Sequence, residues 1–236
     1  MSRIELIPAY LIHRRDYRDT SLLLELFSPT EGRFPAIAQG AKSGRSSRAI
    51  LLQPFAPLRV SLRGRGEVKR LTEVELDGHP LSLQGERVYC GFYINELLMR
   101  LIERGDPYPL LYDCYGENLA RLASDEPADQ CLREFELQLL AELGYGLLLN
   151  YTADTNKLIE SDLLYEYHLE QGPVLSLSGQ SELKIHGRTL ICLHNREPLD
   201  KLGMREAKRL MRRILAHYLG DRPLKSRELF QPIIRA

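Results

Sequence analysis

The stretch that decides the fold spans residues 55–76 and reads FAPLRVSLRGRGEVKRLTEVEL. Apolar and polar side chains alternate along both of its halves, and a period of two is typical of β-strands. Gly64-Arg65-Gly66, in the middle, predicts a tight turn. We therefore predict two strands, over residues 55–62 and 67–76. The positions expected to share one face are Leu58, Val60 and Leu62, followed by Val68, Thr72, Val74 and Leu76.

The chain before this stretch continues the β pattern. Short apolar segments cover residues 5–13, 21–28 and 33–38, and Pro29-Thr30-Glu31-Gly32 predicts a turn between the last two. About five short strands with tight turns are the number found in a small closed barrel such as the OB-fold. Periodicity alone leaves other five-stranded barrels and a small sandwich open.

The period changes to that of helices after His79-Pro80, so we predict one domain over residues 1–80 and a mainly helical one over 81–236. One helix is expected to end near Gly105, and a second to cover residues 110–122. A third, capped by Asp125, is expected to end at Gly144. Residues 145–156 look irregular, and residues 163–177 could form a hairpin or another helical piece. A last helix is expected over residues 203–219. The predicted class is therefore α+β.

Composition excludes several classes of protein. No apolar run reaches the eighteen residues of a membrane span, and the N-terminus lacks the pattern of a secretory signal, so we expect a cytoplasmic, nucleoid-associated protein. The four cysteines are widely spaced without a C-x-x-C pair, which favours free buried thiols over a zinc or redox motif.

Charge is segregated along the chain although the formal net charge is +0. Residues 1–70 hold 13 Lys and Arg against 6 Asp and Glu, and residues 201–236 hold 10 against 3. Residues 71–200 hold 9 against 23. Such asymmetry predicts a polyanionic partner for the basic ends, unless the segments neutralise one another in the fold.

Motifs for catalysis are missing. Gly40-Ala41-Lys42-Ser43 lacks the spacing of a phosphate-binding loop, and Gly64-Arg65-Gly66-Glu67-Val68-Lys69 lacks the third glycine of a dinucleotide site. Cys192 and His194 lie close in sequence, but such a lone pair is more typical of packing than of a nucleophile and its base. We predict no enzymatic activity, no metal and no cofactor; a metal-dependent nuclease is the rival class.

Cations with small and aromatic neighbours predict a nucleic-acid surface in the first seventy residues. Residues 40–48 combine lysine and arginine with glycine and serine, which permit close approach to phosphate. A second cluster, His13-Arg14-Arg15 and Arg18, lies beside Tyr10 and Tyr17, whose rings could stack on unpaired bases. A solubilising surface is the alternative. The predicted DNA-binding residues are Arg14, Arg15, Arg18, Arg33, Lys42, Arg45, Arg48, Arg63, Arg65 and Lys69.

The segment 205–215 predicts a basic amphipathic helix. Its apolar stripe is best explained as core contact, which leaves its cations for DNA or for an acidic peptide. A membrane surface is a third possibility, and the sequence does not separate the three.

Nine short blocks, in order along nearly the whole chain, resemble the RecO family of DNA-repair proteins. They are Ala9-Tyr10-Leu11-Ile12-His13-Arg14, Thr20-Ser21-Leu22-Leu23-Leu24, Gly40-Ala41-Lys42, Leu52-Gln53-Pro54-Phe55, Gly64-Arg65-Gly66-Glu67, Tyr93-Ile94-Asn95-Glu96-Leu97, Arg133-Glu134-Phe135-Glu136, Leu143-Gly144-Tyr145-Gly146 and Pro223-Leu224-Lys225-Ser226-Arg227-Glu228-Leu229-Phe230.

The resemblance implies an N-terminal OB-fold and a largely helical C-terminal domain. It also implies a recombination mediator that binds single- and double-stranded DNA, anneals strands and works with RecR to load recombinase onto strands coated by single-stranded-DNA-binding protein (SSB). An OB-fold protein without a mediator role is the alternative. By similarity, Arg133, with Phe135 and Arg209, is expected to bind the acidic SSB tail; an intrahelical pair of Arg133 with Glu136 or Asp129 is the structural alternative. Many family members carry a four-cysteine zinc site where residues 150–154 read Asn-Tyr-Thr-Ala-Asp, so zinc is not expected.

Overall fold

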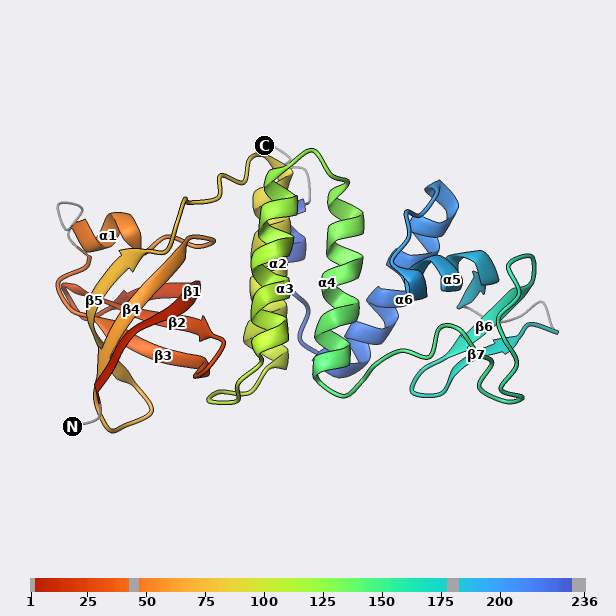
Figure 1. Ribbon diagram of the computed structural model, residues 1–236, viewed down its shortest axis with the longest axis horizontal. Helices are drawn as coiled ribbons and strands as arrows, with labels where there is room; N and C mark the ends of the chain where they lie inside the picture. The colour runs from red at the N-terminus through yellow and green to blue at the C-terminus, as the bar shows by residue number, and fades with distance from the viewer. Residues whose placement is uncertain (1–2, 43–46, 178–182, 231–236) are drawn as a thin grey trace. The chain divides into compact units, whose positions relative to one another are not determined.

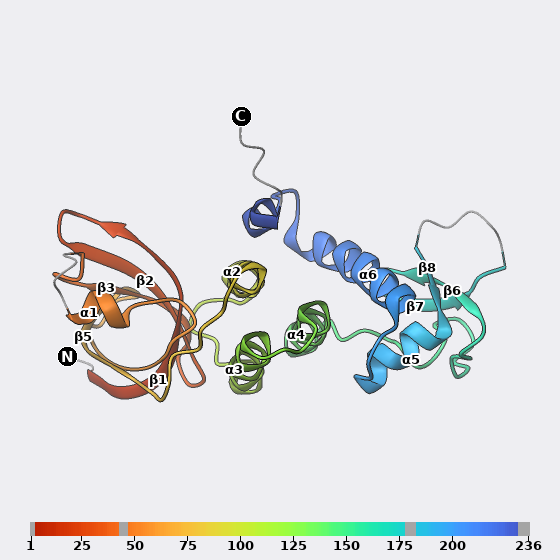
Figure 2. The ribbon, with the colours of Figure 1, turned by 90° about the horizontal axis from the view of Figure 1, so that it is seen from above.

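The N-terminal part of the chain is a closed five-stranded barrel, as Figures 1 and 2 show. The computed structural model describes residues 3–42, 47–177 and 183–230. The strands are β1 (Arg3–Tyr17), β2 (Ser21–Ser28), β3 (Gly32–Ala38), β4 (Pro57–Arg63) and β5 (Lys69–Leu76). They follow one another around the barrel as β1-β2-β3-β5-β4. The helix α1 (Ser47–Leu51) connects β3 to β4, and the predicted OB-fold barrel is confirmed.

Alternation along the strands fills the barrel interior. Leu22, Leu24 and Leu26 of β2 face inward, and Leu58, Val60 and Leu62 of β4 do the same. Small residues of β1 and β3, such as Ala9 and Ala36, leave room for these leucines. Because each inward residue is followed by an outward one, the sequence pattern specifies the register of the barrel.

The predicted alternation of residues 67–76 is wrong at Thr72. Leu71 is the inward residue, at 1% exposure, and Val74 is the next one packed against the core. The pairing with β4 shifts there, from Leu62 opposite Leu71 to Ser61 opposite Glu73. Thr72 is therefore the extra residue of a β-bulge, and its hydroxyl donates to the Ser61 carbonyl (3.0 Å). Val68 precedes the strand and is exposed.

Two helices pack against the barrel, α2 (Glu86–Leu101) and α3 (Pro109–Ala123). The buried amide of Asn95 donates to the Ile12 carbonyl of β1 (3.0 Å) and accepts from the Tyr115 hydroxyl of α3 (2.6 Å). Gly116 lets α3 approach closely, because a Cβ at that position would lie 2.8 Å from the Tyr10 hydroxyl. A 3-10 helix, η1 (Lys225–Phe230), lies on α2.

The described chain divides into two compact units, residues 1–125 with 224–236 and residues 126–223. In the second unit, α4 (Ala128–Glu142) contacts α6 (Lys201–Leu219), and α6 contacts α5 (Gly187–Asn195). A small antiparallel sheet has the order β7-β6-β8, from β6 (Leu164–His168), β7 (Gly172–Leu175) and β8 (Lys184–His186). Of the two alternatives left open for residues 163–177, the hairpin is present, and the C-terminal region is mainly helical. The division at residue 80 stays a prediction.

The predicted starts of two helices are wrong. Asp125 does not cap α4: Pro127 occupies the N-cap position, without a side-chain hydrogen bond. The last helix begins at Lys201 rather than at residue 203, because the Asp200 carboxylate accepts from the Gly203 amide (2.7 Å) and caps it. The short elements α1, α5, β8 and η1 were not predicted.

Candidate nucleic-acid interface

Three of the predicted cations border a groove beside α1, which we call the α1 groove. It lies between the end of β1 and α1, and its lining residues are Arg14, Arg15, Asp16, Leu22, Ala41, Lys42, Ala49, Ile50 and Gln53. A backbone hydrogen bond from Lys42 to Thr20 (3.0 Å) holds the segment after β3 against the β1–β2 turn. Residues separated by twenty-seven positions or more in sequence, such as Arg15 and Lys42, are thereby brought to one surface.

The charges of the α1 groove are only partly compensated. Lys42 forms an exposed ion pair with Asp16 (2.8 Å), and Arg14 donates to the Leu52 carbonyl (2.5 Å). Arg15 is exposed, and within the described chain it forms no ion pair. Ile50, 70% exposed, adds an apolar side chain that a base could contact. The groove thus offers cations for phosphates and one apolar contact.

Two further predicted residues, Arg48 and Arg18, are described by the structure but do not line this groove. Arg48 of α1 donates to the Thr72 carbonyl (3.0 Å), beyond the point where β3 pairs with β5, and so satisfies a strand-edge carbonyl. Arg18 is exposed at the β1–β2 turn, with its guanidinium 5.2 Å from the centre of the Tyr17 ring. Arg45 lies outside the described residues.

Arg33 and Lys69 are held by acids of the barrel. The Arg33 guanidinium contacts the buried Glu25 carboxylate (2.5 Å) and donates to the Ile102 carbonyl (2.9 Å). Arg104 also binds Glu25, through two nitrogens at 2.9 and 3.0 Å. Lys69 pairs with Glu31 (2.9 Å). Acidic partners within the barrel therefore compensate the charges of both Arg33 and Lys69. DNA contact at these two residues stays a prediction.

Arg63 and Arg65 belong to a different surface, at the β4–β5 turn. Both are exposed, and in the described chain neither forms an ion pair. Directly opposite Arg63 across the ladder lies Arg70, which is also exposed and which our prediction omitted. The signal that could have identified Arg70 is its place across the tight turn from Arg63. A hairpin register puts residues on either side of such a turn side by side.

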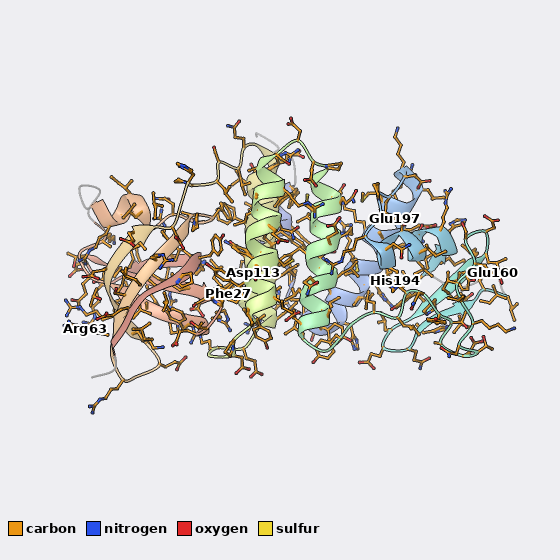
Figure 3. The ribbon with its side chains drawn as sticks, in the orientation of Figure 1. Phe27, Arg63, Asp113, Glu160, His194 and Glu197 are labelled. Atoms are coloured by element: carbon orange, nitrogen blue, oxygen red, sulfur yellow. The ribbon has the colours of Figure 1, made fainter. Side chains whose placement is uncertain are left out.

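OB-folds commonly bind oligonucleotides on the face of strands 2 and 3, and here α3 covers the aromatic residue that β2 contributes to that face. Phe27 of β2 is 0% exposed, with its ring centre 5.7 Å from that of Tyr112 and 6.3 Å from that of Tyr115, both on α3. Burial, with help from Tyr10, raises the pKa of Tyr112 well above its ordinary value. Figure 3 shows Phe27 on the side of the barrel toward α3, and Arg63 on the opposite side.

The residues predicted for an acidic protein tail lie on α4 and α6. Arg133 is 4% exposed and pairs with Glu136 (2.5 Å), the intrahelical alternative that the sequence had left open. Phe135 is 0% exposed. Arg209 is exposed and donates to the Lys184 carbonyl. In this structure, only Arg209 of the three stands on the surface.

The Cys192 thiol lacks the lowered pKa of a reactive nucleophile. Burial, together with Glu197 and Asp200, raises its pKa, whereas a reactive thiolate needs a lowered one. His194 and Glu197 are labelled in Figure 3. Among the described residues the four cysteines form no disulfide, and no group of three His, Cys, Asp or Glu side chains could hold a metal ion.

Hydrogen bonds organise the turn at residues 150–159. The Thr152 hydroxyl contacts that of Thr155 (2.8 Å) and accepts from the Lys157 amide (3.0 Å), while the Thr152 amide donates to the Lys157 carbonyl (2.8 Å). Polar side chains and backbone groups thus hold this turn, at the position where the resemblance places cysteines.

In the part of the chain that the structure describes, no helix is long and apolar enough to cross a membrane.

Comparison with known families and proteins covers both regions of the chain. Residues 1–78 match the family described as "Recombination protein O N terminal", and residues 82–228 match "Recombination protein O C terminal". "DNA repair protein RecO" of Methylococcus capsulatus is 49% identical over 230 residues, which cover 98% of this chain and 94% of the relative. The protein of that name from Nitrosococcus oceani is 47% identical over 234 residues, covering 99% and 95%.

Proposed function

The chain belongs to the RecO family of DNA repair and recombination proteins, and on this premise we propose that it is a non-enzymatic recombination mediator. It binds single- and double-stranded DNA, anneals complementary strands and, together with RecR, loads recombinase onto SSB-coated single strands. The observation that carries DNA binding is the cationic surface of the barrel, where Arg15 in the α1 groove is exposed and forms no ion pair within the described chain. Because phosphate contacts release counterions, they dominate nucleic-acid affinity.

DNA binding through the α1 groove is tested with the double variant Arg15→Ala/Lys42→Ala. Loss of two phosphate contacts should weaken binding of a labelled single strand about tenfold or more, and should flatten the log–log salt slope by about 1.4. Fluorescence anisotropy between 50 and 200 mM salt, the range over which such affinities change steeply, measures both quantities. The effect should be the same for unrelated sequences, since phosphates carry no base information.

The matched control for this test is Lys157→Ala/Arg196→Ala, which removes the same charge from exposed positions of the second unit. If both double variants lose affinity equally, the effect comes from net charge and the groove is not the site. Adding SSB to the strand separates a mediator from a general OB-fold binder: the mediator retains binding to the coated strand.

We assign binding of the acidic SSB tail to the second unit, and this assignment rests on the family resemblance. Arg133→Ala is a poor probe, because it would leave the 0% exposed Glu136 carboxylate without its ion pair, at a cost of about 3–5 kcal/mol. Arg209→Ala is the better one. It should weaken binding of an acidic peptide at least fivefold, since its guanidinium is accessible to a terminal carboxylate. Arg212→Ala, exposed on the same helix, is the control in a titration of labelled peptide.

A nuclease is the class that this proposal excludes. Metal-dependent cleavage needs carboxylates gathered around a cation, and the described residues include no such group. Pure protein incubated with labelled DNA and Mg²⁺ or Mn²⁺ should leave the strand intact; cleavage that co-purifies with the protein would contradict the proposal.

A further inference from the structure

Two arginines lie directly opposite each other on the outside of the barrel, where β4 and β5 meet the β4–β5 turn. Arg63 of β4 pairs in register with Arg70 of β5, and Figure 3 shows Arg63 on the side of the barrel away from α3. We call these two residues the arginine row. Residues directly opposite in an antiparallel ladder project on the same side, with Cβ atoms about 4.5–5.5 Å apart, and like charges there are destabilising. The Arg63–Arg70 pair thus opposes the stability of the isolated barrel.

The rest of the same ladder is matched in charge. Arg59 lies opposite Glu75 and pairs with Asp77 (Nε to Oδ1 3.2 Å). Ser61 lies opposite Glu73 and donates to its carboxylate (3.0 Å). Arg63 and Arg70 are the exception: within the described residues, neither guanidinium has an acidic partner. Repulsion along this ladder is therefore confined to the row next to the turn.

Acids near the row are engaged elsewhere. Glu67, in the β4–β5 turn, binds Arg104 (2.6 Å), and Glu31 binds Lys69 (2.9 Å). Arg65, in the same turn, stays exposed without an ion pair in the described chain. The turn therefore extends the positive charge of the row rather than cancelling it.

On the outer face of β2, one aromatic side chain is covered and one carboxylate is engaged in ion pairs. Phe27 lies beneath α3, and Glu25 is held by Arg33 and Arg104. An oligonucleotide cannot reach Phe27 while α3 is docked there, whereas the β4–β5 face carries exposed guanidinium groups that form no ion pair in the described chain.

We propose that the outer face of β4 and β5, at Arg63 and Arg70, binds the phosphate backbone of single-stranded DNA, with Arg65 extending the site along the turn. This inference rests on the proposed DNA-binding function and adds to it a face and a residue, Arg70. A phosphodiester placed between the two guanidinium groups would accept hydrogen bonds from both and would relieve their repulsion. The strand thus crosses the barrel on the side opposite to α3.

The test is the double variant Arg63→Gln/Arg70→Gln, with binding of a labelled oligothymidylate measured against salt. We expect an affinity loss of about tenfold or more and a salt slope flatter by about 1.4, as for two phosphate contacts on a single strand. The melting temperature should stay the same or rise, because the substitution removes a like-charge pair. Arg59→Gln, on the same ladder but paired with Asp77, is the matched control and should bind within about twofold of wild type.

Three outcomes overturn the inference. Wild-type affinity and slope in the double variant would remove the row from the site while leaving DNA binding intact. Equal losses in Arg59→Gln and the double variant would indicate a general field effect. A lower melting temperature together with weaker binding would assign the two arginines a structural role. If wild type itself shows no salt-dependent DNA binding, the proposed function has failed, which is a different result.

Discussion

Asn95 is the residue through which α2, α3 and the barrel share one hydrogen-bond network. Its side chain is 2% exposed, donates to the Ile12 carbonyl and accepts from the Tyr115 hydroxyl. Both partners are buried, with Tyr115 at 0% exposure and Ile12 at 3%. Because the low dielectric strengthens satisfied polar contacts and penalises unsatisfied ones, this network specifies how the helices dock on the barrel.

Asn95→Ala should lower the free energy of unfolding by about 2–4 kcal/mol, because it removes two buried hydrogen bonds, one to the Ile12 carbonyl and one from the Tyr115 hydroxyl. Urea denaturation followed by circular dichroism measures the change. The control is Asn195→Ala, whose amide contacts Glu197 on the surface and whose loss should cost less than about 0.5 kcal/mol. Equal stability of Asn95→Ala and wild type would contradict the role assigned to the network.

At the same scale, the sequence located the cations but not their partners. Lys42 and Asp16, or Lys69 and Glu31, are far apart in the chain and become ion pairs only in the fold. Arg33 is of a residue type that often contacts DNA, but its contacts with Glu25 and the Ile102 carbonyl are those of a structural residue. Which cation is free is therefore decided by tertiary neighbours, and residue type alone cannot predict it.

At the scale of elements, η1 is held to α2 by the Glu96 carboxylate and by the ring contact between Tyr89 and Phe230, whose centres are 5.7 Å apart. Glu96 accepts from the Lys225 amide (2.9 Å), the Ser226 amide (2.8 Å) and the Ser226 hydroxyl (2.6 Å). Burial by itself would raise the pKa of Glu96, but the hydrogen bonds from Ser226 and Lys225 hold it below its ordinary value. The segment after α6 is thereby fastened to the first unit.

Glu96→Ala should release η1, because three hydrogen bonds to a charged acceptor are lost together. Hydrogen exchange of residues 225–230 should become at least tenfold faster, which corresponds to about 1.4 kcal/mol of local stability. Glu117→Ala removes an exposed carboxylate of α3 and should leave that exchange unchanged. Unaltered protection in Glu96→Ala would show that apolar contacts alone hold η1.

The lowered pKa of Glu96 also predicts a dependence on pH. A carboxylate whose pKa is lower in the folded state contributes stability above its unfolded pKa, near 4.5, and the contribution is lost as the pH falls through the folded pKa. Wild type should therefore lose more stability between pH 7 and acid conditions than Glu96→Ala does. Parallel urea titrations at the two pH values check the sign.

Long elements with a clear period were predictable, and short ones were not. The helix expected at residues 110–122 is α3, and the leucine-rich segment 21–28 is β2. In contrast, α1 has five residues and β8 has three, too few for either period to show. The β-bulge at Thr72 was also not predicted. One inserted residue reverses the alternation of inward and outward side chains, and its position is defined by the pairing with the partner strand.

At the scale of the whole molecule, basic and acidic segments cancel to a formal net charge of +0. Attraction to an anionic surface must then come from local groups of cations, since long-range attraction from net charge is absent. On α6, the apolar stripe that a membrane would need is buried: Ala207, Leu210, Met211 and Leu215 are each 0% exposed. The helix therefore has cations on its surface without an accessible apolar face.

The intact protein should not sediment with anionic lipid vesicles at physiological salt. A peptide of residues 201–219, in which the apolar stripe is free, should do so, because both its apolar and its basic faces are then available. The peptide is the positive control on the same vesicles. Binding of the intact protein at the level of the peptide would restore the membrane-surface alternative.

Local patterns in the sequence were enough to predict the short strands of the first domain, the helical region after it, the basic first seventy residues and, through ordered motifs, the family. These properties depend on periodicity and composition, which neighbouring residues encode. The fold decides which cations are compensated, that α3 covers Phe27 of β2, and that Arg63 and Arg70 lie opposite each other across a ladder. Such features arise from contacts between residues distant in the chain, and no local pattern records which segments will become neighbours.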